Sequence, residues 1–176
     1  MQGNRLDELN IRQACSADQK AIQEVTLAAY QEYAAYVPAQ QWQEYRRNIL
    51  DTLKDAHPAM QLVAEMKGEI VGSVLIVPPG PIPESPNGVP VRPEFPEVRL
   101  LAVTPAARGQ GIGKAIMQAC ITQARRDQVS ALTLHTSDMM QTAMRMYERL
   151  GFLRDPEMDF RPAGDIVIKG YRLELE

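Results

Sequence analysis

Three glycines at alternating positions, Gly109, Gly111 and Gly113, give this sequence its clearest chemical signal. They follow the apolar run 98–103 and open a stretch of helix-forming residues. Glycine lets a ligand approach the backbone closely because it carries no Cβ atom. The first turn of a helix adds unpaired N–H groups and the positive end of the helix dipole. The segment therefore predicts an anion cradle, most naturally for phosphate.

The spacing of these glycines excludes two common phosphate-binding loops. A Walker A loop needs Ser or Thr after its Gly-Lys pair, but the pair at 113–114 is followed by Ala115. A dinucleotide fingerprint needs glycine at its sixth position, which is Lys114 here. The pattern that remains is RxxGxG, starting at Arg108. The alternative interpretation of these residues is a glycine-rich turn between a strand and a helix that binds no ligand.

Three other residues could move protons: Glu97, His135 and Tyr147. A carboxylate or an imidazole can take a proton from an amine. A phenol, with an ordinary pKa of about 10, still holds its proton at neutral pH and can donate it. Each residue also has a structural interpretation. Without a bulge, Glu97 shares a strand face with Arg99 and could simply form an ion pair. His135 could be a hydrogen-bonded structural histidine, and Tyr147 a core tyrosine.

Hydrophobic periodicity and turn residues predict the elements that must position these side chains. A two-residue hairpin is expected at Lys67-Gly68, and a bulge at Gly170 would accommodate a change of apolar phase in the last strand. In chain order we expect a strand at 11–15, helices at 16–33 and 39–56, strands at 60–66, 69–77 and 97–103, a helix at 111–126, a strand at 131–136, a helix at 138–150, and a closing strand pair at 157–161 and 165–175.

A proline-rich segment at 78–96 interrupts this series, with eight of the 13 prolines of the chain. Such a segment cannot form a helix or a central strand. It is expected to be a semi-extended loop. The loop is either a tolerated surface insertion or a lid or dimer arm.

Composition limits the class of protein. The 176 residues suggest one domain over 1–176, with a net charge of −3 that argues against nucleic acid as a partner. No apolar run is long enough to span a membrane, and residues 1–8 lack the apolar stretch of a secretory signal. The chain has only two histidines, so a metal site is not expected. Cys15 and Cys120 are expected to be reduced, mostly buried thiols. We therefore expect a cytoplasmic protein without a metal.

The RxxGxG loop and the segment 143–152 (AMRMYERLGF) together resemble the GCN5-related N-acetyltransferase (GNAT) superfamily, whose second motif is AxxxYExxGF. The element order also matches that superfamily from residue 11 to residue 175. The resemblance implies an α/β (α+β) single-domain GNAT fold. Its central sheet would be mixed, mostly antiparallel and splayed at the acetyl-CoA site, with about four flanking helices.

The resemblance also implies a function. It predicts an N-acetyltransferase that moves an acetyl group from acetyl-CoA to a primary amine by direct transfer in a ternary complex. The acceptor would be a small-molecule amine or a peptide or protein amine, and the enzyme could be a homodimer. A non-catalytic acyl-CoA-binding module and a longer-chain acyltransferase are the alternatives.

By the same resemblance, Tyr147 is the proton donor to the leaving thiolate. Glu97 is the general base, a role that a glutamate on this strand often performs through water in relatives. His135 is a weaker candidate for the base. Relatives often carry Asn where this chain has Met140, so that side-chain contact is lost or comes from Ser137 or Thr142. The residues expected to bind the cosubstrate are Leu101, Ala102, Val103, Arg108, Gly109, Gln110, Gly111, Ile112, Gly113, Lys114, Thr142 and Tyr147.

Aromatic residues gather in the two predicted N-terminal helices, which in the superfamily help to form the acceptor pocket. Four of the six tyrosines (30, 33, 36 and 45) and the only tryptophan, Trp42, fall there. They could line a pocket for an amine, or they could simply pack the helices together.

Overall fold

The computed structural model describes residues 8–54, 59–80, 94–161 and 166–176. They divide into two compact units: the first is formed by the residues up to Leu75 with Leu100–Cys120, and the second by Ile76–Arg99 with Ile121–Glu176. Strands β3 (Glu69–Val77) and β4 (Glu97–Val103) and helix α3 (Ile112–Arg126) each run from one unit into the other. One domain over 1–176 stays a prediction.

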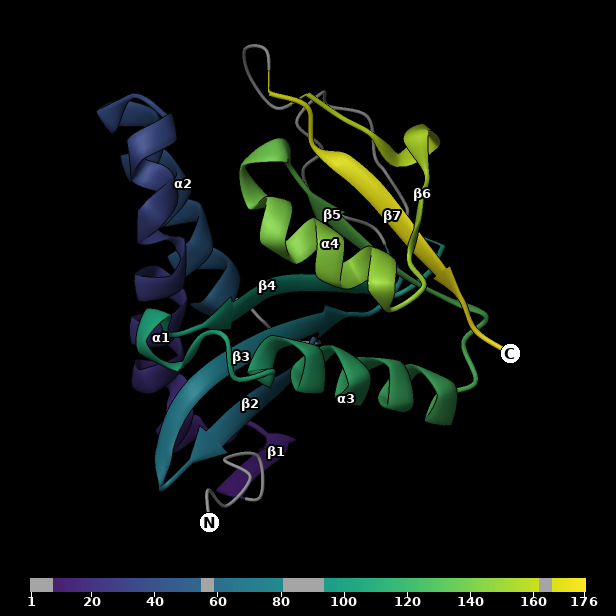
Figure 1. The fold of residues 1–176 in the computed structure, drawn as a ribbon, viewed down its shortest axis with the longest axis horizontal. Helices are drawn as coiled ribbons and strands as arrows, with labels where there is room; N and C mark the ends of the chain where they lie inside the picture. The colour runs from purple at the N-terminus through teal and green to yellow at the C-terminus, as the bar shows by residue number, and fades with distance from the viewer. Residues whose placement is uncertain (1–7, 55–58, 81–93, 162–165) are drawn as a thin grey trace. The chain divides into compact units, whose positions relative to one another are not determined.

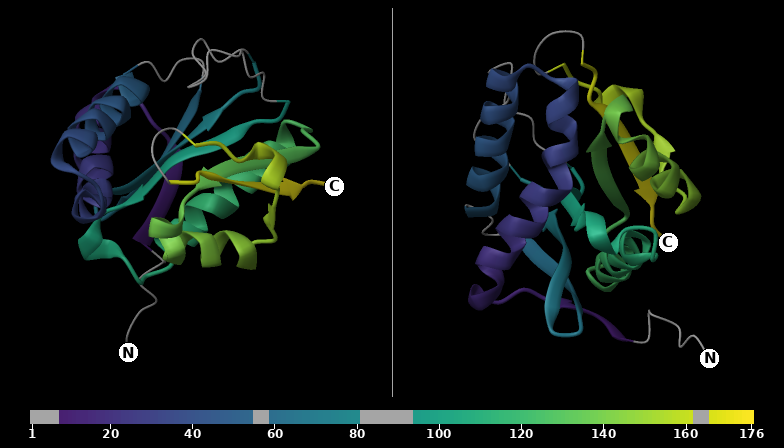
Figure 2. Two further views of the ribbon diagram at one scale, coloured as in Figure 1. Left: turned by 90° about the horizontal axis from the view of Figure 1, so that it is seen from above. Right: turned by 60° about the vertical axis from the view of Figure 1, so that its left-hand side comes forward.

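The first unit combines a helical pair with antiparallel strands. Lys67 and Gly68 join β2 to β3 with positive φ angles of 55° and 80°, which confirms the predicted two-residue hairpin. Helices α1 and α2 lie side by side (Figures 1 and 2). The elements that lie in this unit or enter it are β1 (Leu9–Gln13), α1 (Gln19–Tyr30), α2 (Ala39–Lys54), β2 (Met60–Met66), β3 (Glu69–Val77), β4 (Glu97–Val103) and α3 (Ile112–Arg126).

Apolar side chains at helical and strand spacing bury the inner faces of these elements. In α1 the buried positions include Ile22, Val25 and Ala29, as the periodicity predicts. The helix is shorter than expected because the chain tightens into 3-10 turns at both ends, Ser16–Asp18 before it and η3 (Gln31–Tyr36) after it. The second of these turns, η3, contains the aromatic residues Tyr33 and Tyr36.

The second unit holds the start of β4 and the C-terminal strands. Strand β4 pairs in parallel with β5 through Glu97↔Thr133 and Val98↔Leu134. Strand β7 pairs antiparallel with β5 on one side and with β6 on the other. Its elements after α3 are β5 (Ala131–Thr136), α4 (Gln141–Arg149), β6 (Leu153–Arg154) and β7 (Lys169–Glu174).

The hydrogen-bonded strand order is β1-β2-β3-β4-β5-β7-β6, with the central strand β4 shared by the two units. The sheet is mixed, since β4–β5 is parallel whereas β1–β2, β5–β7 and β6–β7 are antiparallel. Four α-helices accompany the seven strands in the described residues. The predicted fold class and element order are confirmed.

The C-terminal strands differ from the prediction. The β5–β7 ladder is unbroken from Ala131↔Glu174 to Thr136↔Lys169, so the bulge predicted at Gly170 is wrong. The 3-10 turn η6 (Pro156–Met158) stands between β6 and the isolated bridge of Phe160 with Ile168. The predicted strand at 157–161 is therefore replaced by a turn and a single bridge.

Two predictions concern regions that lie wholly or partly outside the described residues. The proline-rich loop at 78–96 falls mostly in the undescribed range 81–93. The polar start of the chain, 1–8, is described only at its last residue. Among the described helices, none has the length and apolar character needed to cross a membrane.

Candidate functional site

The glycine loop has the backbone geometry of an anion cradle. Gly109 and Gly111 have φ angles of 75° and 82°, in the left-handed region that glycine enters without steric cost. The N–H of Ala115 donates to the carbonyl of Gly111 at 3.0 Å, which marks the start of helical bonding. The N–H groups of residues 112–114 therefore lie in the first turn of α3, where no carbonyl of the helix can accept them. They can bind an anionic ligand.

The side chain of Arg108 contacts the protein rather than the open side of the loop. Its Nη2 donates to the carbonyl of Ala29 at 2.8 Å, its Nη1 to Glu32 Oε2 at 2.9 Å, and its Nε to the carbonyl of Val103 at 3.4 Å. Ala29 lies in the last turn of α1, where carbonyls lack helical partners and favour cations. Arg108 thus ties the loop to the end of α1.

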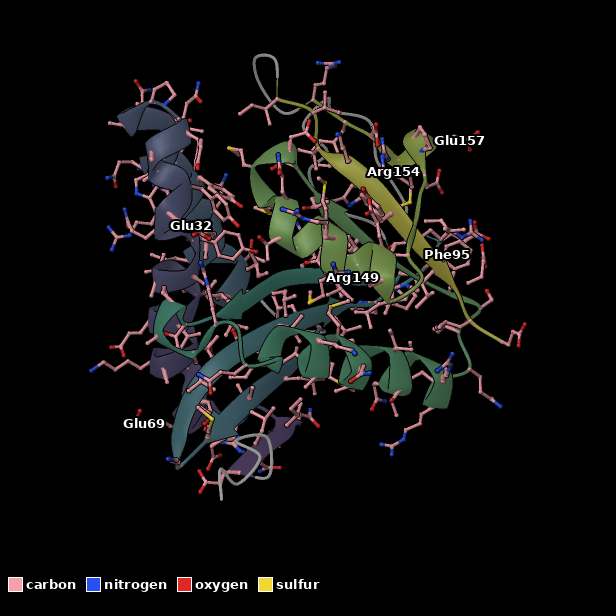
Figure 3. All side chains as sticks on the ribbon, in the orientation of Figure 1. Glu32, Glu69, Phe95, Arg149, Arg154 and Glu157 are labelled. Atoms are coloured by element: carbon pink, nitrogen blue, oxygen red, sulfur yellow. The ribbon has the colours of Figure 1, made fainter. Side chains whose placement is uncertain are left out.

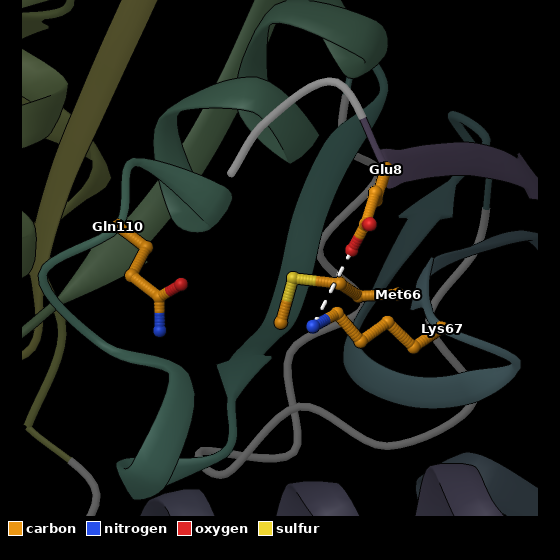
Figure 4. A pocket seen from close by; sticks show the side chains of 4 residues that line it. All are labelled: Glu8, Met66, Lys67 and Gln110. Carbon is orange, nitrogen blue, oxygen red and sulfur yellow. Dashed lines mark ion pairs between the residues drawn. The ribbon is translucent and has the colours of Figure 1, made fainter. Parts of the chain in front are cut away.

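Gln110 faces the β2–β3 hairpin across a small pocket (Figure 4). The pocket is lined by Glu8, Met66, Lys67 and Gln110, and Lys67 Nζ lies 3.5 Å from Glu8 Oε2. Its volume is about 170 Å³, below the roughly 300–1,000 Å³ of most small-molecule sites. It could accommodate part of a ligand bound at the loop but not a whole cosubstrate.

Strand β4 contains a backbone outlier between the candidate base and the predicted donor-binding residues. Leu100 has a φ of 51°, which is uncommon for a bulky side chain and typically marks a functional or strained position. Before it, Glu97 and Arg99 share a face as predicted, with Arg99 Nε 3.9 Å from Glu97 Oε1. The register pairs with β5 precede Leu100. The predicted splay of the sheet beyond this point stays a prediction.

The two candidate bases contact each other. His135 Nδ1 lies 2.8 Å from Glu97 Oε1, and His135 Nε2 lies 3.0 Å from the carbonyl of Met158. The side chains are 14% exposed for Glu97 and 20% exposed for His135. Burial alone would lower the pKa of His135, but the hydrogen bond and charge of Glu97 outweigh it, so the pKa is raised above 6.5. The structure therefore pairs the two residues.

Tyr147 lies on the inward face of α4, as helical spacing predicts. It is 7% exposed, and its ring meets that of Phe152 edge-to-face at 6.1 Å. The next residue, Glu148, accepts a hydrogen bond at 3.1 Å from the hydroxyl of Tyr171 in β7, which helps fix α4 on the strand. The aromatic ring is thus packed by neighbours that do not depend on its hydroxyl.

Two buried hydroxyl groups at the end of β5 lack partners among the described residues. Thr136 and Ser137 are 3% and 2% exposed, and neither side-chain oxygen has a hydrogen bond there. A buried hydroxyl without a partner is costly, so these groups suit a ligand with polar groups of its own. Thr142, the other candidate, is exposed.

The aromatic residues of α1, η3 and α2 pack against one another in the first unit. Tyr30 meets Tyr33 and Tyr45 edge-to-face at 5.7 and 6.0 Å, and Trp42 meets Tyr45 at 6.0 Å. Burial, together with the charge of Glu32, raises the pKa of Tyr33 to about 12. Glu32 itself projects from η3 (Figure 3). Helix packing accounts for these contacts, so they do not by themselves identify an acceptor pocket.

The cysteines differ from each other in exposure. Cys120 is fully buried in α3, and burial raises the pKa of its thiol to about 12, so it remains protonated at neutral pH. Cys15 is exposed, so the expectation of two mostly buried thiols is wrong for it. A catalytic thiolate is therefore not supported at Cys120.

Among the predicted site residues, Leu101–Val103 and Arg108–Lys114 lie in the first unit, and Glu97, His135, Thr142 and Tyr147 lie in the second. Sequence reasoning missed Glu32 and Thr136. Its hydroxyl stands at the end of the predicted strand 131–136, directly before Ser137, and that position was a usable signal for Thr136. The contact of Arg108 with Glu32 joins residues 76 positions apart and had no local signal.

Residues 21–152 match the family model described as the acetyltransferase (GNAT) family. N-acetyltransferase 8B of Mus musculus is 36% identical over 126 residues, which are 72% of this chain and 51% of the relative. This chain spans about half the length of the first curated relatives it matches.

Solved structures share the fold at low identity. A GNAT-family acetyltransferase from Staphylococcus aureus Mu50 has a TM-score of 0.70 and 16% identity, covering 96% of this chain and 99% of that one. A structure from Salmonella typhimurium solved with acetyl-CoA has a TM-score of 0.62 and 20% identity, covering 96% and 95%.

Proposed function

This chain belongs to the acetyltransferase (GNAT) family, and we propose that it moves an acetyl group from acetyl-CoA to a primary amine by direct transfer in a ternary complex. The observation that carries the proposal is the pair of buried hydroxyls of Thr136 and Ser137, which have no hydrogen-bond partner among the residues that the structure describes. They directly follow His135 on β5 and precede the helix that carries Tyr147. A bound ligand with polar groups would satisfy them.

When bound, acetyl-CoA supplies an acetyl group activated as a thioester. The first-turn N–H groups of α3, after Gly111, would hold its pyrophosphate. Backbone groups of residues 101–103 would pair with its amides in the manner of an added strand. Thr136 and Ser137 would hydrogen-bond the polar groups that reach the end of β5.

Two side chains would move protons during transfer. Glu97 takes the proton that the acceptor nitrogen releases as it becomes bonded to the acetyl carbon, directly or through water. A phenol ordinarily keeps its hydroxyl proton at neutral pH, and Tyr147 donates that proton through Oη to the departing sulfur. Both groups are held by their surroundings, Glu97 by His135 and Tyr147 by Phe152. The acceptor would be a small-molecule amine or an amine of a peptide or protein.

The test is thiol release from acetyl-CoA in the presence of a panel of primary amines, with mass spectrometry of the products. Release that depends on an amine and yields an N-acetyl product supports the proposal. Tight CoA binding without turnover across the panel would instead indicate a binding module. Turnover only with longer acyl-CoA donors would indicate a longer-chain acyltransferase.

A further inference from the structure

The hydrogen bonds of His135 fix where its protons are. Nε2 faces the carbonyl oxygen of Met158, which can only accept, so Nε2 must carry a proton. Nδ1 faces Glu97 Oε1 at 2.8 Å. An ionised carboxylate and an unprotonated ring nitrogen would both be acceptors and would repel each other. At this distance the contact therefore holds one proton between Nδ1 and Oε1.

The imidazole has little freedom to leave this arrangement. Gly170 lies opposite His135 in the β5–β7 ladder, and a Cβ there would lie 2.3 Å from the Cβ of Met158. The absence of that Cβ lets η6 approach β7, which brings the Met158 carbonyl within reach of the ring. The Phe160 ring packs edge-to-face on the imidazole at 5.3 Å. Both nitrogens of His135 are occupied, so the imidazole has no free lone pair for an acceptor amine.

Glu97, by contrast, retains a free acceptor atom. Its Oε1 contacts His135 and lies 3.9 Å from Arg99 Nε. Its Oε2 makes no hydrogen bond to another residue in the part of the chain that the structure describes. The basic atom open to a substrate is therefore on Glu97, and the group that can share its proton is His135.

We propose that Glu97 and His135 work as one base, in which His135 is a positioning residue that stores the proton Glu97 receives. The inference rests on the proposed acetyl transfer. The pair accepts a proton only after it has lost the shared one, and it then consists of ionised Glu97 and neutral His135. From that form, the N–H bond of the acceptor amine breaks as its nitrogen bonds the acetyl carbon, and its proton binds the carboxylate. The proton then passes to Nδ1, leaving an imidazolium beside a carboxylate, and solvent removes it after product release.

Other charged groups near the ring affect how readily His135 is protonated. Arg99 on β4 opposes protonation of His135, whereas Glu97 favours it. Asp159, which follows η6, interacts with His135 and is itself paired with Arg154 at 2.8 Å. Figure 3 places Arg154 beside η6. On β7, the residue opposite His135 is the uncharged Gly170. A pair that releases its proton above pH 6.5 is a stronger base than an isolated glutamate, which suits an amine.

The direct test is NMR of the histidine ring nitrogens as a function of pH. The chain has two histidines, His57 and His135, so a His57→Gln variant leaves one imidazole to observe. We expect both nitrogens of His135 to be protonated at low pH, with a pKa above 6.5. Glu97→Gln should lower that pKa, because an amide N–H can donate to a neutral Nδ1. A pKa unchanged by Glu97→Gln would overturn the pairing, whether or not the protein acetylates amines.

The second test is the pH profile of kcat/KM with two acceptor amines of different pKa. For the wild type, one acidic limb should stay above pH 6.5 with both amines. In His135→Gln, whose amide can still hold the Glu97 carboxylate, that limb should move to lower pH, with KM within about twofold and kcat lowered about tenfold. An unmoved limb in the folded variant would refute proton storage on His135.

Discussion

Arg108 Nη1 donates to Glu32 Oε2 at 2.9 Å, which ties the first residue of the glycine loop to the element that follows α1. The same guanidinium donates to the carbonyl of Ala29. The pair is about half exposed, at 40% for Arg108 and 48% for Glu32. An exposed ion pair contributes less than about 1 kcal/mol, so the carbonyl contacts carry most of the positioning.

Arg108→Lys should weaken acetyl-CoA binding about fivefold, or about 1 kcal/mol, because one ammonium cannot replace three guanidinium contacts. Glu32→Gln is the matched control, since it removes the ion pair and leaves the contacts with Ala29 and Val103. Isothermal titration calorimetry should find its affinity within twofold of wild type. Equal losses in both variants would mean that the ion pair, not the carbonyls, holds the loop.

Gly111→Arg should abolish cosubstrate binding, with a loss of at least roughly 100-fold, by placing a bulky side chain in the cradle. Gly68→Arg is the control: its φ of 80° matches the 82° of Gly111, and a Cβ there meets nothing within 4 Å. Both changes force an L-residue into left-handed backbone at about 1–2 kcal/mol, measured by urea unfolding. Only Gly111→Arg should lose CoA. Retained binding in that variant would remove the loop from the donor site.

The sequence could predict the parts of this protein that depend on local pattern. Strand β4 and the loop after it, the hairpin at Lys67-Gly68 and the inward face of α4 follow from periodicity and turn chemistry. Relations between distant segments carry no such signal. Met158 approaches His135 because Gly170, far along the chain, leaves room for it. Even there the sequence suggested the wrong device, a bulge, because the phase shift of apolar residues does not reveal an inserted turn.

The candidate base illustrates the same limit. Sequence reasoning ranked Glu97 and His135 as alternatives, since they lie 38 positions apart in the sequence. The parallel pairing puts Glu97 beside Thr133, and from there His135 lies two residues along the same face. The two residues are therefore partners. No spacing rule within one segment could predict that contact.

Tyr147→Phe should lower kcat roughly 100-fold and leave the Kd for acetyl-CoA nearly unchanged. The phenyl ring keeps the packing with Phe152, whereas the hydroxyl that donates the proton is lost. Tyr171→Phe is the control in the same unit, because it removes a hydroxyl that donates to Glu148. That change should cost about 1 kcal/mol of unfolding free energy without a change in kcat. Wild-type turnover in Tyr147→Phe would make Tyr147 a core residue only.

Thr136→Val and Ser137→Ala should each weaken acetyl-CoA binding without destabilising the free protein. In the free protein each removes a buried hydroxyl without a described partner, so unfolding free energy should stay level or rise by about 1 kcal/mol. Acetyl-CoA binding should weaken about fivefold in each variant, because the ligand loses a hydrogen bond.

Thr133→Val on the same strand is the control for those two changes. Its hydroxyl donates to the carbonyl of Pro96 at 3.0 Å, so its loss should destabilise the fold by about 1–2 kcal/mol and spare binding. Thermal unfolding and calorimetry measure both quantities. Destabilisation of Thr136→Val and Ser137→Ala with unchanged affinity would contradict the assignment of those hydroxyls to the donor.

The Glu97–His135 pair should make stability depend on pH in a defined direction. The folded pKa of His135 is raised above the 6.5 of the unfolded chain by Glu97. The folded state therefore binds the proton more tightly, and the contribution is fully present below pH 6.5 and lost as pH rises through the folded pKa. Glu97→Gln should destabilise the protein by about 2 kcal/mol at pH 6, and by less at pH 9.

Glu148→Gln is the matched control for that difference. Glu148 accepts from Tyr171, and burial raises the pKa of that phenol, so its hydroxyl keeps its proton through pH 9. The cost of Glu148→Gln should then be the same at pH 6 and pH 9. Urea unfolding of wild type and both variants at the two values measures the difference directly. If Glu97→Gln instead lowered the unfolding free energy more at pH 9 than at pH 6, His135 would not be the protonated partner. The shared proton would then have to lie elsewhere.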